Sequence, residues 1–239
     1  MTCADWVQFG GVLFLGFAAI AVAIFGPYAG DAFKRRLLAP RLQIKYKNEP
    51  PYSHQTKLAF QRVENFPEEF PTYYFRFTIE NHGKSLARSC EVLLEEVWTA
   101  NEQGKYQRVK EFWTTNLTLQ GNLYMDINPG RPPVYVAIGH ISSPECQKKR
   151  EQPYSIHTDR FDYYRFIFDF PEGQRLFANI DSRPRGKHLF EVVIVGENFE
   201  PIKRYFVLSW SGNWTEDDQQ MLQNEAIITL KGSAKELEV

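Results

Sequence analysis

The alternation of hydrophobic and polar residues is clearest between Tyr74 and Asn81, where it predicts a β-strand. The apolar positions are Phe75, Phe77 and Ile79, and the polar positions are Arg76, Thr78 and Glu80. Successive side chains of a strand point to opposite faces, so this pattern indicates a sheet with one buried face and one face in water. Asn81-His82-Gly83 then supplies turn residues, and a second strand is expected from about Ser89 to Ala100.

Short patterns of the same kind recur along the chain. We expect further strands at 41–47, 106–113, 123–127, 134–141, 166–170, 188–195, 202–210 and 227–230. No helical pattern alternates with them, which favours a mainly β fold, an elaborated antiparallel β-sandwich, over a parallel α/β sheet. Thr215 precedes three acidic residues, which predicts a short C-terminal helix that ends near Asn224.

Two stretches lack the alternation and are expected to be long loops. The first, 48–72, contains Pro50, Pro51, Pro67 and Pro71. Proline cannot donate a hydrogen bond to a sheet, so an ordered sheet is not expected there. The second, 142–160, is polar and charged throughout much of its length.

Residues 6–25 contain no charged side chain and are long enough to span a membrane. At about 1.5 Å of rise per residue, a helix of this length covers the roughly 30 Å hydrocarbon core. We therefore expect a transmembrane helix at 6–27, after a short non-cytoplasmic tail at 1–5. No Lys or Arg precedes this helix and several follow it, so the rest of the chain is expected in the cytoplasm, held by a single pass in a bacterial inner membrane.

Basic residues gather in the juxtamembrane segment 28–40 and just after it, whereas the chain from Asn48 onward is net acidic. We expect the membrane surface to be contacted by Lys34, Arg35, Arg36 and Arg41. Each Lys or Arg beside an anionic leaflet is worth about 1 kcal/mol, although these residues could also serve only to set the topology. The acidic body argues against nucleic acid as a partner. The expected partners are the lipid bilayer and another protein.

Residues that could carry chemistry form no known motif. Three cysteines are too few for a disulfide framework, and the five histidines have no spacing that would place two on one metal ion. A GxSxG elbow, a Walker loop and a CxxC pair are all missing from the sequence. We therefore expect no catalytic, cofactor-binding or metal-binding residue. Glu95 and Glu96 are neighbours on a predicted strand and should point to opposite faces, unless a bulge turns one of them inward.

Two further groups of residues leave alternatives open. Asp159, Asp162 and Asp169 would line a small polar pocket or lie on a solvated loop. Tryptophans in a β-domain usually pack in the core, but when exposed they make interface hot spots. Trp210 and Trp214 are the candidates for such an interface, and Trp98 and Trp113 are the other tryptophans of the domain.

Phe75 to Val92 reads FRFTIENHGKSLARSCEV, a strand, an Asn-x-Gly turn and a second strand. This segment resembles the signature of the cell-adhesion-related immunoglobulin-like domains of bacteria. The whole chain, with its N-terminal anchor, Gly26-Pro27-Tyr28 and the Trp210–Trp214 region, looks like uncharacterised bacterial single-pass membrane proteins. The resemblance implies an immunoglobulin-like β-sandwich, here placed at 41–231 with a flexible tail at 232–239, and it brings no catalytic residue.

These observations favour a membrane-anchored, non-enzymatic interaction or scaffold module. One alternative is a membrane-bound small-ligand sensor or enzyme with a site assembled from distant loops. A second alternative is an extracytoplasmic adhesion or envelope module. No cofactor is expected for the first of these functions.

Overall fold

The computed structural model describes residues 38–60, 68–110, 112–146, 166–170, 182–183 and 185–233. The expected transmembrane helix 6–27, the tail 1–5 and most of the basic segment 28–40 lie outside the described residues. So does most of the expected tail 232–239.

Among the described residues, no helix has the length and apolar character needed to cross a membrane. What is described is mainly β, and all the paired strands are antiparallel.

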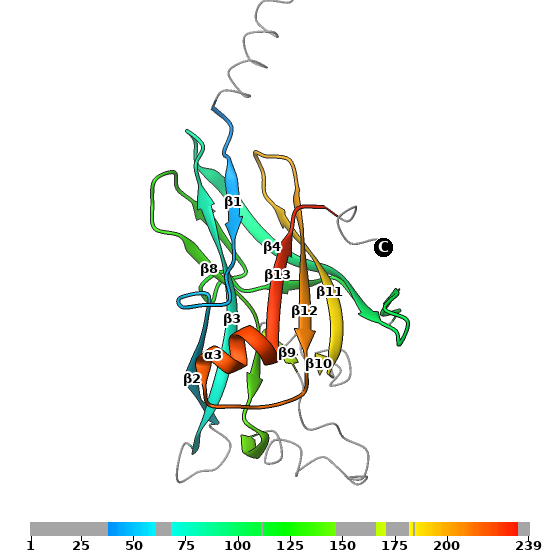
Figure 1. The fold of residues 1–239 in the computed structure, drawn as a ribbon. Helices are drawn as coiled ribbons and strands as arrows, with labels where there is room; N and C mark the ends of the chain where they lie inside the picture. The colour runs from blue at the N-terminus through cyan, green and yellow to red at the C-terminus, as the bar shows by residue number, and fades with distance from the viewer. Residues whose placement is uncertain are drawn as a thin grey trace, which may run out of the picture.

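The first of two sheets, here called the six-stranded sheet, has the order β1-β3-β8-β9-β10, and β2 pairs with β3 beyond the end of β1. Its strands are β1 (Leu42–Lys45), β2 (Ser53–Phe60), β3 (Glu68–Asn81), β8 (Val134–Ser142), β9 (Phe166–Phe168) and β10 (Ser182–Arg183). The long strand β3 pairs with β1 and β2 along one side and with β8 along the other (Figure 1).

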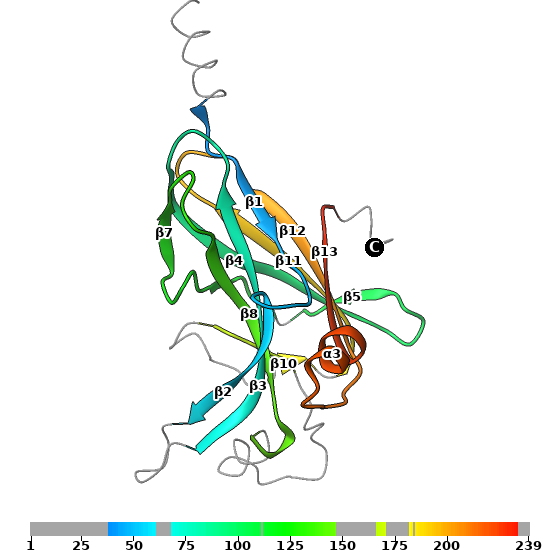
Figure 2. The same cartoon turned by 60° about the vertical axis from the view of Figure 1, so that its left-hand side comes forward.

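The second sheet, the seven-stranded sheet, has the order β13-β12-β11-β4-β5, and β6 and β7 also pair with β4. Its strands are β4 (Ala87–Ala100), β5 (Tyr106–Arg108), β6 (Thr115–Leu117), β7 (Tyr124–Ile127), β11 (Gly186–Val195), β12 (Ile202–Trp210) and β13 (Ala226–Lys231). Figure 2 shows β7 and β5 at opposite ends of β4.

The hydrophobic core lies between the two sheets, which pack face to face. Phe190 of β11 contacts two rings of β9, with centroid distances of 5.9 Å to Phe166 and 5.0 Å to Phe168. Phe77 of β3 contacts Phe206 of β12 at 5.1 Å. All five side chains have no exposed surface. Aromatic pairs at these distances add to the hydrophobic gain from burial, so they hold the layers together.

The predicted alternation of β3 is confirmed on its inner face, because Phe75, Phe77 and Ile79 are completely buried. On the outer face the expectation of a wet surface is wrong at Thr78, which is only 1% exposed. Its partners across the neighbouring strands are Lys45 and Tyr135, and these long side chains flank the short threonine. The alternation within β3 could not predict the burial of Thr78, because the side chains that cover it belong to other strands.

The predicted loop 48–72 is wrong over most of its described part, because this stretch contains β2 and the beginning of β3. The sequence of β2 is SHQTKLAF, an edge strand whose first five residues show no apolar alternation. Pro71 has no N–H to donate to a neighbouring strand, but its carbonyl still accepts a hydrogen bond from the Ser143 N–H at 2.9 Å, just beyond the end of β8. Of the second predicted loop, 142–160, only 142–146 is described, and Ser142 still belongs to β8.

A short C-terminal helix is confirmed. It consists of α3 (Asp218–Gln220) and a π-helical turn, Met221–Glu225, that follows directly. The N-cap is Asp217 rather than the predicted Thr215, since the Asp217 carboxylate accepts from the Gln220 N–H at 2.7 Å. Two buried side chains of the turn, Met221 and Leu222, join the core.

A fragment from Leu38 to Val239 is expected to fold without the preceding residues, because all described strands and the core lie within it. It must include Ala39 and Pro40, whose backbones pack against Gly83. Its far-ultraviolet circular dichroism should be dominated by β signal. A mainly helical spectrum would contradict the fold.

Candidate functional site

The residues expected at the membrane surface are only partly described. Lys34, Arg35 and Arg36 lie outside the described residues, and Arg41 is exposed where the chain enters β1. The Arg41 backbone N–H donates to Asn81 Oδ1 at 3.2 Å, which fixes this point of the chain to the end of β3.

The two tryptophans predicted as an interface are packing residues instead. Trp210 is 2% exposed because it continues the inward row of β12 formed by Phe206 and Leu208. Trp214 is half-buried, and its ring lies edge-on to that of Tyr73 with a centroid distance of 5.2 Å. The buried indole of Trp210 cannot be offered to a partner, so the predicted interface is wrong at Trp210, whereas Trp214 keeps part of its surface exposed.

A different pair of aromatic residues is exposed on the seven-stranded sheet. Trp113 is 76% exposed just before β6, and Tyr124 is 65% exposed at the start of β7. Leu123, beside Tyr124, is 41% exposed. Since β6 and β7 both pair with β4, these side chains follow one edge of the sheet. Sequence reasoning missed Trp113 because it extended the strand over 106–113, whereas β5 ends at Arg108 and Phe112 is the buried residue.

The outer face of the seven-stranded sheet beside this edge carries apolar rows on both sides of a charged cluster. Strand register places Leu93 beside Val193 in one row, and Trp98, Leu189 and Val207 in another. Between the two rows lie Glu96, Glu191 and Tyr205, which are direct neighbours across β4, β11 and β12. This outer face is therefore amphipathic, with carboxylates in its centre.

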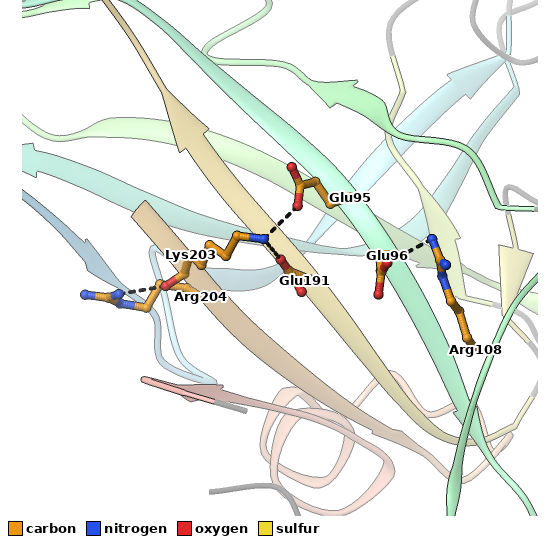
Figure 3. Close-up of polar contacts among 6 residues, drawn as sticks. All are labelled: Glu95, Glu96, Arg108, Glu191, Lys203 and Arg204. Atoms are coloured by element: carbon orange, nitrogen blue, oxygen red, sulfur yellow. Dashed lines mark hydrogen bonds and ion pairs between the residues drawn. The ribbon is translucent and has the colours of Figure 1, made fainter. Parts of the chain in front are cut away.

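Lys203 joins the carboxylates into a fixed cluster (Figure 3). Its ammonium group donates to Glu191, which is 7% exposed, and to Glu95 at 3.0 Å. Arg108 pairs with Glu96 at 2.8 Å. The Arg204 guanidinium turns away and donates to the Lys203 carbonyl at 2.7 Å. Each carboxylate of the cluster thus has a cationic partner, which offsets the cost of partly burying its charge.

Burial and charge act together on the titratable groups of this cluster. Hydrogen bonds from Lys203 to Glu191 and Glu95 raise the pKa of the Lys203 ammonium above its ordinary value. Burial raises the pKa of Tyr205, and the neighbouring Glu191 adds to that rise. The lysine is therefore held cationic at neutral pH and supplies a fixed positive charge on this face.

Glu95 and Glu96 were expected on opposite faces unless a bulge turned one of them inward; the bulge is present, but it leaves both side chains on the outer face. The register of β4 against β11 shifts between Glu191 and Val192, so that Glu96 pairs with Glu191 and Leu94 pairs with Val192. Glu95 is the extra residue of this bulge, and its partner Lys203 also contacts Glu191. A bulge inserts one residue into the strand, which allows two successive side chains to reach the same face.

A separate polar pair lies on the six-stranded sheet. His140 is 3% exposed, and its Nδ1 is 2.7 Å from Asp169 Oδ1, while the Tyr74 ring packs 5.4 Å from the imidazole. His140 Nε2 and Asp169 Oδ2 are buried and have no hydrogen-bond partner among the residues that the structure describes. Of the predicted aspartate group, Asp159 and Asp162 lie outside the described residues. In the part of the chain that is described, no three His, Cys, Asp or Glu residues gather as a metal site would require.

Replacing Lys203 with methionine is expected to lower the free energy of unfolding by about 1 to 2 kcal/mol, because Glu191 then keeps a buried charge without its cation. The effect is limited because the lysine side chain is 53% exposed, so water screens part of the interaction. Adding Glu191→Gln should recover part of the loss in a double-mutant cycle measured by urea unfolding. A coupling energy of zero would show that the contact contributes nothing.

Comparison of the chain with protein-family models, with curated proteins and with solved structures finds no match. Function must therefore be inferred from the strand order, the exposed aromatic residues and the charges described above.

Proposed function

We propose that the chain is a membrane-anchored, non-enzymatic interaction module that binds another protein through the seven-stranded sheet. The observation that carries the proposal is the exposure of Trp113 and Tyr124 along one edge of that sheet. Tryptophan and tyrosine are the residues most enriched among interface hot spots. The neighbouring charged cluster of Glu95, Glu191 and Lys203 supplies fixed charges that would select a partner by complementarity.

Strand order supports an immunoglobulin-like fold for this module. The order β1-β3-β8 in one sheet corresponds to A-B-E of the immunoglobulin sandwich, and β4-β11-β12 in the other corresponds to C-F-G. The strands also follow one another along the chain in the order A, B, C, E, F, G. The neighbour of β8 departs from the pattern, because β9 follows β8 in the chain where strand D would precede it. The conserved inter-sheet disulfide of antibody domains has no counterpart within the described residues, where Cys90 and Cys146 are free.

Anchoring rests on the uncharged segment 6–25 and on the basic residues that follow it. In a bacterial inner membrane, the basic residues after the anchor would stay on the cytoplasmic side, so the sandwich would lie in the cytoplasm. There the tether raises the effective concentration of the sandwich near membrane partners. A reporter fused after Val239 tests this orientation. Activity of a cytoplasmic reporter supports it, and activity of a periplasmic reporter such as alkaline phosphatase contradicts it.

The His140–Asp169 pair favours a second candidate function, a small-ligand sensor or enzyme. An imidazole whose Nδ1 is fixed by a carboxylate can use Nε2 to bind a ligand or accept a proton, and because His140 Nε2 is buried, a ligand would have to enter the domain to reach it. A ligand that binds only the folded state raises the unfolding temperature, so a metabolite panel tested on the full chain would identify it. The expected result for an interaction module is no shift with any compound. A shift that is abolished by His140→Gln would favour the second candidate.

A further inference from the structure

Asn81, the last residue of β3, joins three segments at one end of the sandwich. Its Oδ1 accepts from the N–H groups of Arg41 and Gly83, at 3.2 and 2.9 Å. Its Nδ2 donates to the carbonyls of Ser85 and Ile127, at 2.8 and 2.9 Å. A buried amide with all its partners satisfied fixes the relative positions of these segments.

Gly83 shows how tightly the segments approach one another. A Cβ atom at this position would lie 2.5 Å from the Arg41 nitrogen and 2.6 Å from the Ala39 carbonyl oxygen. The turn after β3 is thus packed directly on the backbone where the chain enters the domain. The turn before β8 is attached as well, because the Gly130 N–H donates to the Asn81 carbonyl at 3.4 Å.

The exposed charges on these three segments are all positive. Within 38–41, 82–86 and 127–133 the residues with permanent charges are Arg41, Lys84 and Arg131, and each is exposed. We call these three residues the basic end.

The acidic residues near the basic end lie outside its three segments, and they are held by a cation at Glu80 and by neutral serine groups at Asp126 and Glu197. Glu80 contacts Lys45 at 2.7 Å and His82 at 2.9 Å. Asp126 accepts from the Ser89 N–H at 2.8 Å, and Glu197 accepts from the Ser89 hydroxyl at 2.8 Å. Glu200, on the turn between β11 and β12, is a further exposed carboxylate of this region. The basic end therefore presents cations that are not neutralised by carboxylates of its own segments.

We infer that the basic end is a second membrane-contact surface, which holds this end of the sandwich against anionic lipid headgroups. The inference rests on the proposed membrane anchor. Arg41 follows Arg36 by five residues, which span at most about 18 Å of extended chain. Lys34, Arg35 and Arg36 on the membrane would thus keep Arg41, and with it Lys84 and Arg131, near the surface. Each Lys or Arg near an anionic surface strengthens association about fivefold.

The test uses the full chain with Cys3→Ser and a fluorophore on Asn128→Cys, an exposed position next to the basic end. The chain is reconstituted in vesicles that carry a quencher on a fraction of the headgroups. One set of vesicles contains phosphatidylglycerol and the other only phosphatidylcholine. We expect clearly stronger quenching in the anionic vesicles, and this excess should disappear when the salt concentration is raised to about 1 M, where the screening length is about 3 Å. Free phosphate at low concentration should leave the excess unchanged, which distinguishes a lipid surface from a phosphate site.

Charge reversal with Lys84→Glu and Arg131→Glu should reduce quenching in anionic vesicles to the phosphatidylcholine level. The matched control is Lys57→Glu on β2, an exposed lysine on another part of the six-stranded sheet, which should leave quenching unchanged. Equal quenching in both kinds of vesicle, or full quenching in the reversed variant, would overturn the inference. Flotation separates this result from failure of the anchor: a chain that floats with both kinds of vesicle is anchored, and a chain that does not float overturns the anchor and the inference together.

Discussion

Replacing Phe190 with alanine is expected to lower the free energy of unfolding by about 3 to 5 kcal/mol, the usual cost of truncating a buried phenylalanine. Phe190 has no exposed surface and contacts Phe166 and Phe168 of the opposite sheet. Its removal would leave a cavity between the two layers that neither sheet can fill without moving. Domains are commonly stable by only about 5 to 15 kcal/mol, so the loss would be a large part of the total. Urea unfolding of the fragment 38–239 measures it.

Tyr124→Ala is the matched control for this prediction. Tyr124 is also an aromatic residue of the seven-stranded sheet, but it is 65% exposed. Its truncation should cost less than about 1 kcal/mol, since a surface substitution removes little buried area. Equal losses for the two variants would mean that the sheets do not pack through Phe190.

Asn81→Ala is expected to cost about 3 kcal/mol, because it removes all four hydrogen bonds of a buried amide. Each buried backbone group left without a partner costs about 1 to 3 kcal/mol, and water can reach some of these groups at the end of the sandwich. Hydrogen exchange should speed up most at the N–H groups of Arg41 and Gly83, which lose their acceptor.

Asn122→Ala serves as the comparison for Asn81. Asn122 is an exposed asparagine whose side chain makes one long contact, 3.5 Å to the Leu119 carbonyl. Its replacement should change stability by less than about 0.5 kcal/mol. If Asn81→Ala were as mild as this control, the end of the sandwich would not be organised by the Asn81 amide.

The alternation of apolar and polar residues correctly predicted the strands in which it is strong. It failed for segments whose structure depends on pairing with another strand. The row Phe75, Phe77 and Ile79 could be predicted because period-two apolar residues need a buried face. Strand β2 could not, because its first residues are polar and its place in the sheet depends on pairing with β3. The burial of Thr78 likewise comes from Lys45 and Tyr135 on neighbouring strands.

The candidate site was predicted even less well, for the same physical reason. Glu95 and Glu96 share a face only because of a bulge, and a bulge is a property of two paired strands. Trp210 and Trp113 are both tryptophans near the end of a predicted strand, yet one is 2% and the other 76% exposed. The residue at which a strand ends decides whether the next side chain faces the core. Strand ends are also the feature that a sequence pattern predicts least reliably.

The most direct test of the proposed function is capture of partner proteins by the full-length chain from native membranes. The unchanged protein is compared with the double variant Trp113→Ala and Tyr124→Ala, with Lys110→Ala as an exposed control in the same region. Truncation of a hot-spot residue costs about 2 kcal/mol or more, so the double variant should bind its partner at least about 30-fold more weakly while the control binds normally. Capture of the same proteins in equal yield by the double variant would contradict binding through this edge of the seven-stranded sheet.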